Sequence, residues 1–281
     1  MMLKDLILIK LGGSLITDKN KPFCAKREVI RRLAKEIKSA LSFQYDLIIG
    51  HGSGSFGHTV ASKYQTQKGI INKDSIWGLS LVADAAIQIN RIVVDEFLKT
   101  KLPVISFAPA SFMMAKNQKL DKILTSQIKN SLKIGSIPII YGDMVMDSKQ
   151  GFCIFSGETT LDILAKNLMH DYKNVWMILC GDTNGVLNPN GQTIPKINKQ
   201  NFAKISVGVG GSASTDVTGG MLHKVKTSLD LASSFGIKSY IINGKTPNKL
   251  KEILMGKNLQ DVTLICNQRQ SMTIVCREAN D

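Results

Sequence analysis

Residues 47–58, Leu47-Ile48-Ile49-Gly50-His51-Gly52-Ser53-Gly54-Ser55-Phe56-Gly57-His58, join an apolar run to a glycine-rich loop. The run is typical of a buried strand, and residues 59–64 after the loop can form a helix. Glycines let the backbone approach a ligand and turn several N–H groups towards it, and a helix behind them adds the positive end of its dipole. The two histidines that bracket the loop can each donate a hydrogen bond near neutral pH. The stretch therefore predicts a strand–loop–helix unit that binds an anion, with a phosphate as the first candidate.

Short apolar runs alternate with longer amphipathic stretches along the whole chain. The apolar runs predict strands at residues 6–10, 46–49, 104–107, 137–141, 175–179, 239–242 and 273–276. The amphipathic stretches predict helices at residues 27–42, 76–100, 127–134, 161–171, 220–235 and 247–255. Because the runs are apolar throughout, the strands are expected to be buried on both faces by helices. We therefore expect an α/β fold, a three-layer αβα sandwich with a mainly parallel, open central sheet.

The composition indicates a globular chain with a complete core. The 281 residues are 43% hydrophobic, and no Pro-rich or Gly/Ser-rich linker divides them. We expect a single domain over residues 1–281, in which two halves, about 1–171 and 172–281, are distinguishable. Residues 207–218 are small and polar and predict a loop. No apolar run approaches the roughly 20 residues that cross a bilayer, and the start does not resemble a signal peptide, so we expect no membrane partner.

The cysteines indicate the cellular compartment of the protein, and the net charge indicates the kind of molecule that it binds. The five cysteines are scattered without C-x-x-C spacing, which favours free thiols and a cytoplasmic location. The formal net charge of +14 attracts either nucleic acid or a small polyanion such as ATP. The lysines are spread along the chain, and an aromatic-rich RNA-binding signature, a paired-cysteine finger and a basic helix are all missing from the sequence. We therefore expect no nucleic-acid partner and favour a small polyanion.

Two further glycine motifs carry lysines. Lys10-Leu11-Gly12-Gly13-Ser14 ends the first predicted strand, and Lys19 follows it, so ammonium groups can lie beside phosphates that approach the backbone. The stretch 216–221, Asp-Val-Thr-Gly-Gly-Met, opens the helix that carries Lys224 about one turn in. Each motif alone is also compatible with an ordinary strand–turn or turn–helix junction.

Acidic residues accompany these motifs. Glu158 and Asp162 are four residues apart at the start of a predicted helix, so they share one face and can orient lysines or Mg²⁺. Their alternative role is to complement the helix dipole. The stretch 181–186, Gly-Asp-Thr-Asn-Gly-Val, follows a predicted strand and is either an ordinary turn or a place where Asp182 contacts a nucleotide.

Two common nucleotide-binding motifs fit the sequence poorly. Gly52, Gly54 and Gly57 match a dinucleotide fingerprint, which requires an acidic residue after a second strand about 20 residues on. Asp74 is the available acid, and it lies among polar residues rather than after an apolar strand. Gly244-Lys245-Thr246 has the end of a Walker A motif, but Ser239 stands where that motif needs its first glycine. ATP chemistry here would therefore use another scheme.

Taken in order along the chain, the motifs resemble the amino acid kinase superfamily. They are KLGGS at 10–14, the glycine loop at 50–58, GD at 142–143, SGE and DILA within 156–165, GDTNGV at 181–186 and DVTGGM followed by a lysine within 216–224. Within the superfamily, HGSGSFGH at 51–58, Lys19 after Ile-Thr-Asp, and DVTGGM are most similar to isopentenyl phosphate kinases, which make isopentenyl diphosphate from isopentenyl phosphate and ATP. The resemblance extends to about residue 245. It implies the αβα sandwich, a homodimer, an acceptor site in the N-terminal half and a nucleotide site in the C-terminal half.

The resemblance also implies residue roles. Lys10 and Lys224, with Lys19 close by, would bracket the ATP phosphates, and Glu158 stands where the family usually has an aspartate that organises the lysines. The nucleotide would be bound by Gly12, Gly13, Ser14, Asp182, Asn184, Gly185, Val186, Gly219 and Gly220. The acceptor phosphate would be held by His58 together with Gly54, Ser55, Gly57 and Gly157. Mg²⁺ would arrive on ATP, and no protein residue is assigned as a metal ligand.

The identity of the acceptor is the open question. A phosphate acceptor is already an oxyanion, so phosphoryl transfer needs alignment and cations rather than a general base. The helix at 76–100 offers an apolar acceptor slot with Trp77, Leu79, Val82, Ala83 and Ile87, although residues at this spacing can equally form core. The alternatives are a related kinase for a phosphonate of the fosfomycin type, UMP or an amino acid carboxylate, and a non-catalytic nucleotide- or anion-binding protein. The joint presence of Lys10, Lys19, His58 and Lys224 favours a kinase.

Overall fold

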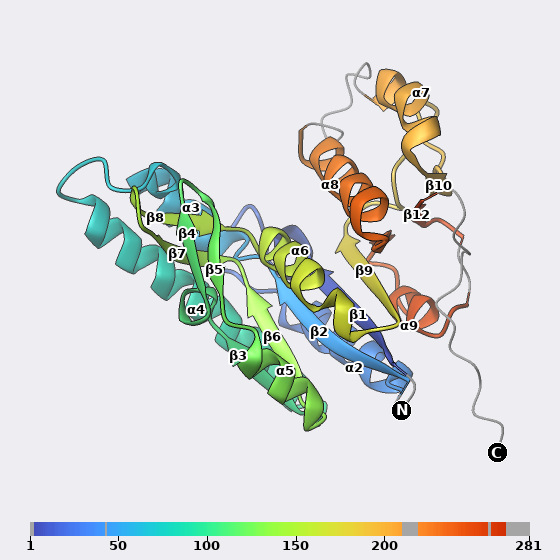
Figure 1. Ribbon diagram of the computed structural model, residues 1–281, viewed down its shortest axis with the longest axis horizontal. Helices are drawn as coiled ribbons and strands as arrows, with labels where there is room; N and C mark the ends of the chain where they lie inside the picture. The colour runs from blue at the N-terminus through green and yellow to red at the C-terminus, as the bar shows by residue number, and fades with distance from the viewer. Residues whose placement is uncertain (1–2, 43, 210–218, 258–259, 268–281) are drawn as a thin grey trace.

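The apolar runs of the sequence form one large sheet (Figure 1). The computed structural model describes residues 3–42, 44–209, 219–257 and 260–267. Within them the eight-stranded sheet has the order β10-β12-β11-β9-β1-β2-β6-β3, and all neighbours are parallel except β11 and β12. Its strands are β1 (Asp5–Leu11), β2 (Tyr45–His51), β3 (Val104–Phe107), β6 (Ile137–Tyr141), β9 (Asn174–Gly181), β10 (Lys196–Ile197), β11 (Lys238–Asn243) and β12 (Thr263–Ile265). The predicted strand at 273–276 lies outside the described residues.

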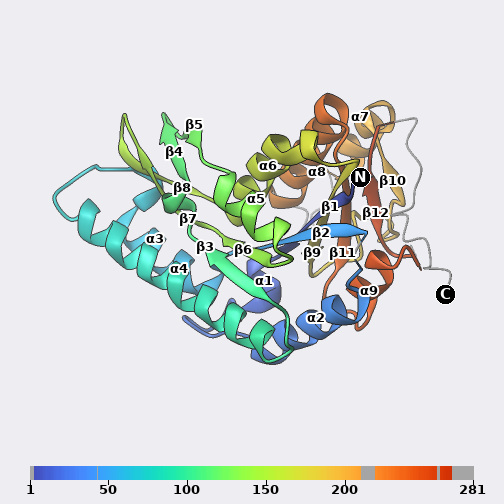
Figure 2. The same ribbon diagram turned by 60° about the horizontal axis from the view of Figure 1, so that its bottom comes forward.

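Helices cover both faces of this sheet, which confirms the predicted three-layer αβα sandwich (Figure 2). One face packs against α1 (Gly13–Ile16), α2 (Arg27–Ala40), α3 (Ser55–Tyr64), α4 (Ser75–Leu98) and α9 (Lys249–Leu254). The other packs against α5 (Ser126–Lys133), α6 (Gly157–Leu168), α7 (Lys199–Val209) and α8 (Gly219–Phe235). Short 3₁₀ turns lie at η1 (Thr66–Lys68), η2 (Pro109–Ser111) and η3 (Met169–Asp171). The prediction of a loop at 207–218 is wrong for residues 207–209, which belong to α7, and residues 210–218 lie outside the described part.

The side chains of β1 alternate between the two faces of the sheet, and this alternation decides on which face Lys10 lies. Ile7 and Ile9 are buried in the core beneath α2 and α4, whereas Leu6 and Leu8 are buried beneath α6 and α8. Because successive side chains of a strand point to opposite faces, Lys10 belongs to the second set. The strand therefore delivers one lysine to the α6–α8 face at its carboxyl end.

Helix α4 illustrates how composition and packing differ. By length and composition this 24-residue helix could span a membrane. Its apolar side chains Ala85, Ile89, Val93 and Phe97 recur at helical spacing and are buried in the core. The helix packs against α2, α3 and β3, so it has the position of a core helix in the fold.

A second, smaller sheet was not predicted. Its strands are β4 (Met113–Lys116), β5 (Lys119–Ile123), β7 (Asp143–Asp147) and β8 (Gly151–Phe155), in the order β5-β4-β7-β8. The buried carboxylate of Asp147 joins its two hairpins by accepting the backbone N–H groups of Asn117, Gln118, Lys149 and Gln150. Burial alone would raise the pKa of Asp147, but these four donors hold it below its usual value.

Candidate active site

Two adjoining cavities open at the carboxyl ends of β1, β2 and β9. This is the edge at which open parallel sheets bind ligands. The first cavity has a volume of about 240 Å³ and lies towards β9 and α8. The second has a volume of about 580 Å³ and lies towards α3 and α4. Lys10, Ser14 and Lys19 line both cavities, so they mark the place where the two meet.

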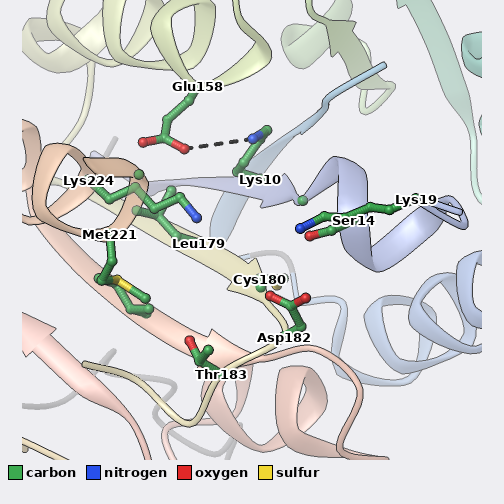
Figure 3. Close-up of a pocket in the computed structure, with 14 residues that line it drawn as sticks. Lys10, Ser14, Lys19, Glu158, Leu179, Cys180, Asp182, Thr183, Met221 and Lys224 are labelled. Atoms are coloured by element: carbon green, nitrogen blue, oxygen red, sulfur yellow. Dashed lines mark ion pairs between the residues drawn. The ribbon is translucent and has the colours of Figure 1, made fainter. Parts of the chain in front are cut away.

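Three lysines from separate elements converge on the first cavity. Lys10 comes from the end of β1, Lys19 follows α1, and Lys224 lies one turn into α8. In Figure 3, Lys19 and Lys224 reach into the cavity from opposite sides, with Lys10 beside them. The structure thus brings together the three lysines predicted from the sequence.

Lys10 is held in place by an acid of α6. Its ammonium lies 3.7 Å from a carboxylate oxygen of Glu158, and both side chains are nearly buried. Burial lowers the pKa of Lys10, and the charge of Lys224 lowers it further, whereas the carboxylates of Glu158 and Asp162 raise it. Glu158 therefore does reach the lysine despite its longer side chain, and it favours the charged form of Lys10.

Asp162 lies one helical turn beyond Glu158 and is also buried. Burial, assisted by the neighbouring carboxylate of Glu158, raises the pKa of Asp162 to about 7. The two acids predicted to share a helix face thus lie in different environments. One forms an ion pair at the cavity, and the other is a buried carboxyl that changes charge near neutral pH.

The remaining predicted nucleotide residues divide into two groups. Gly12, Asp182 and Gly220 line the first cavity, and Gly13 lines the second. Asn184, Gly185 and Val186 are absent from the described lining of both cavities, because the turn after β9 carries them away from it. Val186 is buried in the core and Asn184 accepts a hydrogen bond from Asn243. Gly219 begins α8 directly before Gly220.

Several residues of the first cavity were missed by the sequence reasoning. They are Leu179, Cys180 and Ile241, together with Gly181 and Met221, which belong to the quoted motifs but were given no role. Thr183 lies in the stretch 182–186 that was expected to line the nucleotide site, and it does line this cavity. Leu179 and Ile241 belong to β9 and β11, where an apolar residue that lines a cavity has the same pattern as one that is buried in core. The only feature of the sequence that could have identified Leu179 and Ile241 as cavity residues was their position near the ends of predicted strands.

All five residues predicted to hold the acceptor line the second cavity, namely Gly54, Ser55, Gly57, His58 and Gly157. Helix α3 begins at Ser55 rather than at residue 59, so the second half of the glycine loop is its first turn and His58 lies on its exposed side. Gly157 is the first residue of α6, whose N-cap Ser156 accepts the backbone N–H of Thr159. The amide of Ser55 is already engaged, because it donates to Thr17 Oγ1 at 3.0 Å.

The wall beyond His58 is apolar. It consists of Ala61, Val82, Ala86, Ile154 and Phe155, from α3, α4 and β8. The prediction of an apolar slot on the helix at 76–100 is therefore right for Val82 but wrong for Trp77 and Ile87, whose side chains are largely exposed. Leu79 and Ala83 do not line the described cavity either. Helix α4 turns the Val82–Ala86 face towards the cavity, and these residues are one helical turn apart.

His51, the first histidine of the glycine loop, does not belong to the site. It is completely buried, stacks on Tyr141, and lies 3.2 Å from both the Asn90 side chain and the Gly52 carbonyl oxygen. Burial lowers the pKa of His51 to about 4, so it is neutral at physiological pH. Only His58 remains as a histidine that can meet a ligand in this loop.

The arrangement suits the transfer of a phosphoryl group between two bound anions. Lys10 and Lys19 lie at the junction of the cavities, Lys224 lines the first cavity, and a glycine loop with His58 lines the second. Among the described residues there is no group of three His, Cys, Asp or Glu side chains that could hold a metal ion. Such a site stabilises transferred charge by positioned cations and needs no covalent nucleophile.

Comparison with known proteins agrees with this geometry. The model of the amino acid kinase family matches residues 5–243. The chain is 35% identical to the isopentenyl phosphate kinase of Methanocaldococcus jannaschii over 264 residues, which cover 90% of this chain and 96% of that one. It is 31% identical to the isopentenyl phosphate kinase of Methanothermobacter thermautotrophicus, with 91% and 97% covered. A solved isopentenyl phosphate kinase superimposes with a TM-score of 0.76 at 30% identity and covers 92% of this chain and 99% of that one. The chain belongs to the amino acid kinase family and, within it, to the isopentenyl phosphate kinases.

Proposed function

We propose that this protein transfers the γ-phosphoryl group of ATP to isopentenyl phosphate, giving isopentenyl diphosphate and ADP. The observation that carries the proposal is the pair of cavities that share Lys10, Ser14 and Lys19. One cavity is small and polar enough for the phosphates of a nucleotide. The other combines a phosphate-binding loop with an apolar wall, which suits a phosphate ester with a short hydrocarbon tail.

The reaction follows from the residues at the junction. A phosphate oxygen of the acceptor, held by His58 and the glycine loop, attacks the γ-phosphorus of ATP while the bond to the β-phosphate oxygen breaks. Lys10, Lys19 and Lys224 face the transferred group from different sides and stabilise the charge on its equatorial oxygens. Because the acceptor oxygen is already anionic, no residue has to remove a proton from it.

Mg²⁺ would come with ATP rather than from a site made by the protein alone. It would neutralise negative charge on the phosphates during the transfer. Carboxylate oxygens are suitable partners for Mg²⁺, and Glu158 and Asp182 are the acids that line the nucleotide cavity.

The chemistry of the second cavity supports this acceptor over the alternatives. The charged or ionisable side chains that line it are Lys10, Lys19, His58 and Asp143, and its apolar wall is made of alanine, valine, isoleucine and phenylalanine. An amino acid acceptor would need a cationic clamp for its carboxylate, and a nucleoside acceptor would need polar partners for its base. A five-carbon hydrocarbon tail needs neither.

The proposal extends to the organisation of the chain. The described lining of the second cavity lies within residues 10–157, and that of the first comes partly from residues 179–241. We propose an acceptor-binding N-terminal half, about 1–171, and a nucleotide-binding C-terminal half, about 172–281, in a homodimer. A cytoplasmic location is supported by the four described cysteines, all of which are free thiols.

An ADP-release assay with Mg·ATP tests the proposal. The acceptors are isopentenyl phosphate, dimethylallyl phosphate, fosfomycin, UMP, glutamate and acetylglutamate. We expect kcat/KM on isopentenyl phosphate to reach at least about 10⁴ M⁻¹s⁻¹, the low end for ordinary enzymes. Turnover confined to another acceptor would refute the substrate but keep the kinase, and ATP binding without turnover on any of the six would refute both.

A further inference from the structure

The two phosphate-binding loops touch each other directly. Gly13 of the first loop and Gly54 of the second lie so close that a Cβ on Gly13 would be 2.9 Å from the Cα and N atoms of Gly54. Gly54 also has φ 51° and ψ −133°, a conformation that favours glycine. The two loops therefore meet backbone to backbone, with no side chain of Gly13 or Gly54 between them.

Thr17 lies at this contact and bonds to both loops. Its hydroxyl donates to the Gly13 carbonyl oxygen at 2.8 Å and accepts the Ser55 backbone N–H at 3.0 Å. Its own backbone N–H donates to the same Gly13 oxygen at 2.9 Å. Thr17 is fully buried and lines neither of the two cavities. A Cβ on Gly54 would lie 2.1 Å from the Thr17 hydroxyl oxygen, so that hydroxyl fills the space left by the glycine.

We propose that Thr17 is a positioning residue that fixes the distance between the nucleotide phosphates and the acceptor phosphate. The inference rests on the proposed function, since it requires that the loop at Gly12 to Ser14 meets ATP and the loop at Gly54 to His58 meets the acceptor. Thr17 touches no substrate. It acts by holding the backbone of one loop against that of the other.

The Thr17 hydroxyl is the part of the side chain that holds the loops together, because it makes two hydrogen bonds at once. Valine has nearly the same shape as threonine but can neither donate to Gly13 nor accept from Ser55. Without the Thr17 hydroxyl, the Ser55 backbone N–H loses its partner and can turn towards the acceptor anion. The two loops can then shift relative to each other. Displacement of reacting groups by about 1 Å can lower a rate by about 10²-fold, although each substrate still binds.

The test compares Thr17→Val with Thr17→Ser. For Thr17→Val we expect kcat to fall by about 10- to 100-fold. The dissociation constants of ATP and of isopentenyl phosphate, measured separately by calorimetry, should stay within about twofold. We also expect a larger fraction of ATP to be hydrolysed without phosphorylation of the acceptor. Thr17→Ser keeps the hydroxyl and should restore kcat to within a few-fold of the wild type.

Ser136→Ala is the matched control for stability. Ser136 is a buried residue whose hydroxyl donates to the Pro103 carbonyl oxygen, just before β6 and so at the opposite end of the sheet from the cavities. Its loss should lower Tm but leave kcat unchanged. If Thr17→Val does not fold, Thr17→Cys replaces it, because a thiol of similar size is a weak hydrogen-bonding group.

Three results would overturn the inference: an unchanged kcat in Thr17→Val, a loss of activity confined to weaker binding, or a Thr17→Ser variant as slow as Thr17→Val. The wild-type protein is assayed first, so that this failure is separate from failure of the proposed function. If the wild type phosphorylates another acceptor instead, the same variants are compared on that acceptor.

Discussion

Lys10 is a nearly buried ammonium at the junction of the two cavities, where we propose that its positive charge stabilises the transferred phosphoryl group. Preorganised donors of this kind are typically worth about 10²- to 10³-fold in kcat. We predict that Lys10→Met lowers kcat by about that factor, because a cation facing the transferred group is lost and Glu158 keeps its charge without a partner. Steady-state kinetics with both substrates would measure this. Lys4→Met is the control, since Lys4 precedes the same strand and pairs with Asp46 far from the cavities. Equal activity of the two variants would contradict the assignment.

Glu158 controls how far Lys10 stays charged as the pH rises. Burial lowers the pKa of Lys10 and the Glu158 carboxylate raises it, so Glu158→Gln should lower it further. The charged form is the active one, and activity is therefore lost as the pH rises through the pKa of Lys10. We predict that the basic limb of the kcat profile in Glu158→Gln moves to lower pH, by about one unit, as expected for loss of one close opposite charge.

Profiles between pH 6 and 10 test this directly, with Glu28→Gln as an exposed control on α2. Glu158→Gln also removes the carboxylate that helps to raise the pKa of Asp162, so the basic limb, and not the acidic limb, reports on Lys10. A basic limb that does not move in Glu158→Gln would show that Glu158 does not regulate the charge of Lys10.

At the scale of elements, ion pairs of the buried Glu96 connect α2 and α4. The carboxylate of Glu96 on α4 is fully buried and pairs with Arg27 and Arg31 of α2 and with Lys99 at the end of α4. Burial alone would raise the pKa of Glu96, but these cations lower it to about 2. A depressed pKa adds stability above the unfolded-state value, and that stability is lost as the pH falls towards 2.

Glu96→Gln should therefore lower the free energy of unfolding at pH 7 by about 2 kcal/mol, the value of hydrogen bonds to a charged group. The difference from the wild type should shrink as the pH falls below about 4, where an unfolded-state glutamate binds its proton. Urea unfolding at pH 7 and at pH 3 measures both quantities. An equal difference at the two pH values would mean that the effect is packing and not charge.

The elements predicted from the sequence are those with a strong local pattern. The predicted strands of the central sheet, β1, β2, β3, β6, β9 and β11, each have an apolar run, and α2 and α4 have helical spacing of apolar residues. The other two strands of that sheet, β10 and β12, were missed because they are only two and three residues long. The small sheet was missed because β5, Lys119-Leu120-Asp121-Lys122-Ile123, is mostly exposed and depends on pairing with β4. The lysines and glycine loops of the site were predicted because their residue types are unusual at strand ends. Ile154 and Thr17 could not be predicted, because their roles arise only when distant segments meet.

At the scale of the whole molecule, β3 lies at one edge of the central sheet. It is the last strand in the order, and within the described part of the chain no strand pairs with its outer N–H and C=O groups. Large apolar side chains are exposed on it and on the adjoining helix α4, namely Ile105, Leu98 and Ile87. An open strand edge beside exposed apolar residues is typical of a surface that pairs with a second copy of the chain.

We predict that the homodimer forms through this edge and that Ile105→Lys converts it to a monomer, because a charged side chain on an edge strand opposes pairing. Light scattering after size-exclusion chromatography gives the mass of each form, against 30.8 kDa for one chain. Ile76→Lys is the control, since Ile76 is even more exposed than Ile105 but lies at the start of α4. Each chain supplies the described lining of both cavities by itself, so the monomeric variant should keep its kcat. A monomeric wild type would refute the dimer, and a dimeric Ile105→Lys would refute the edge.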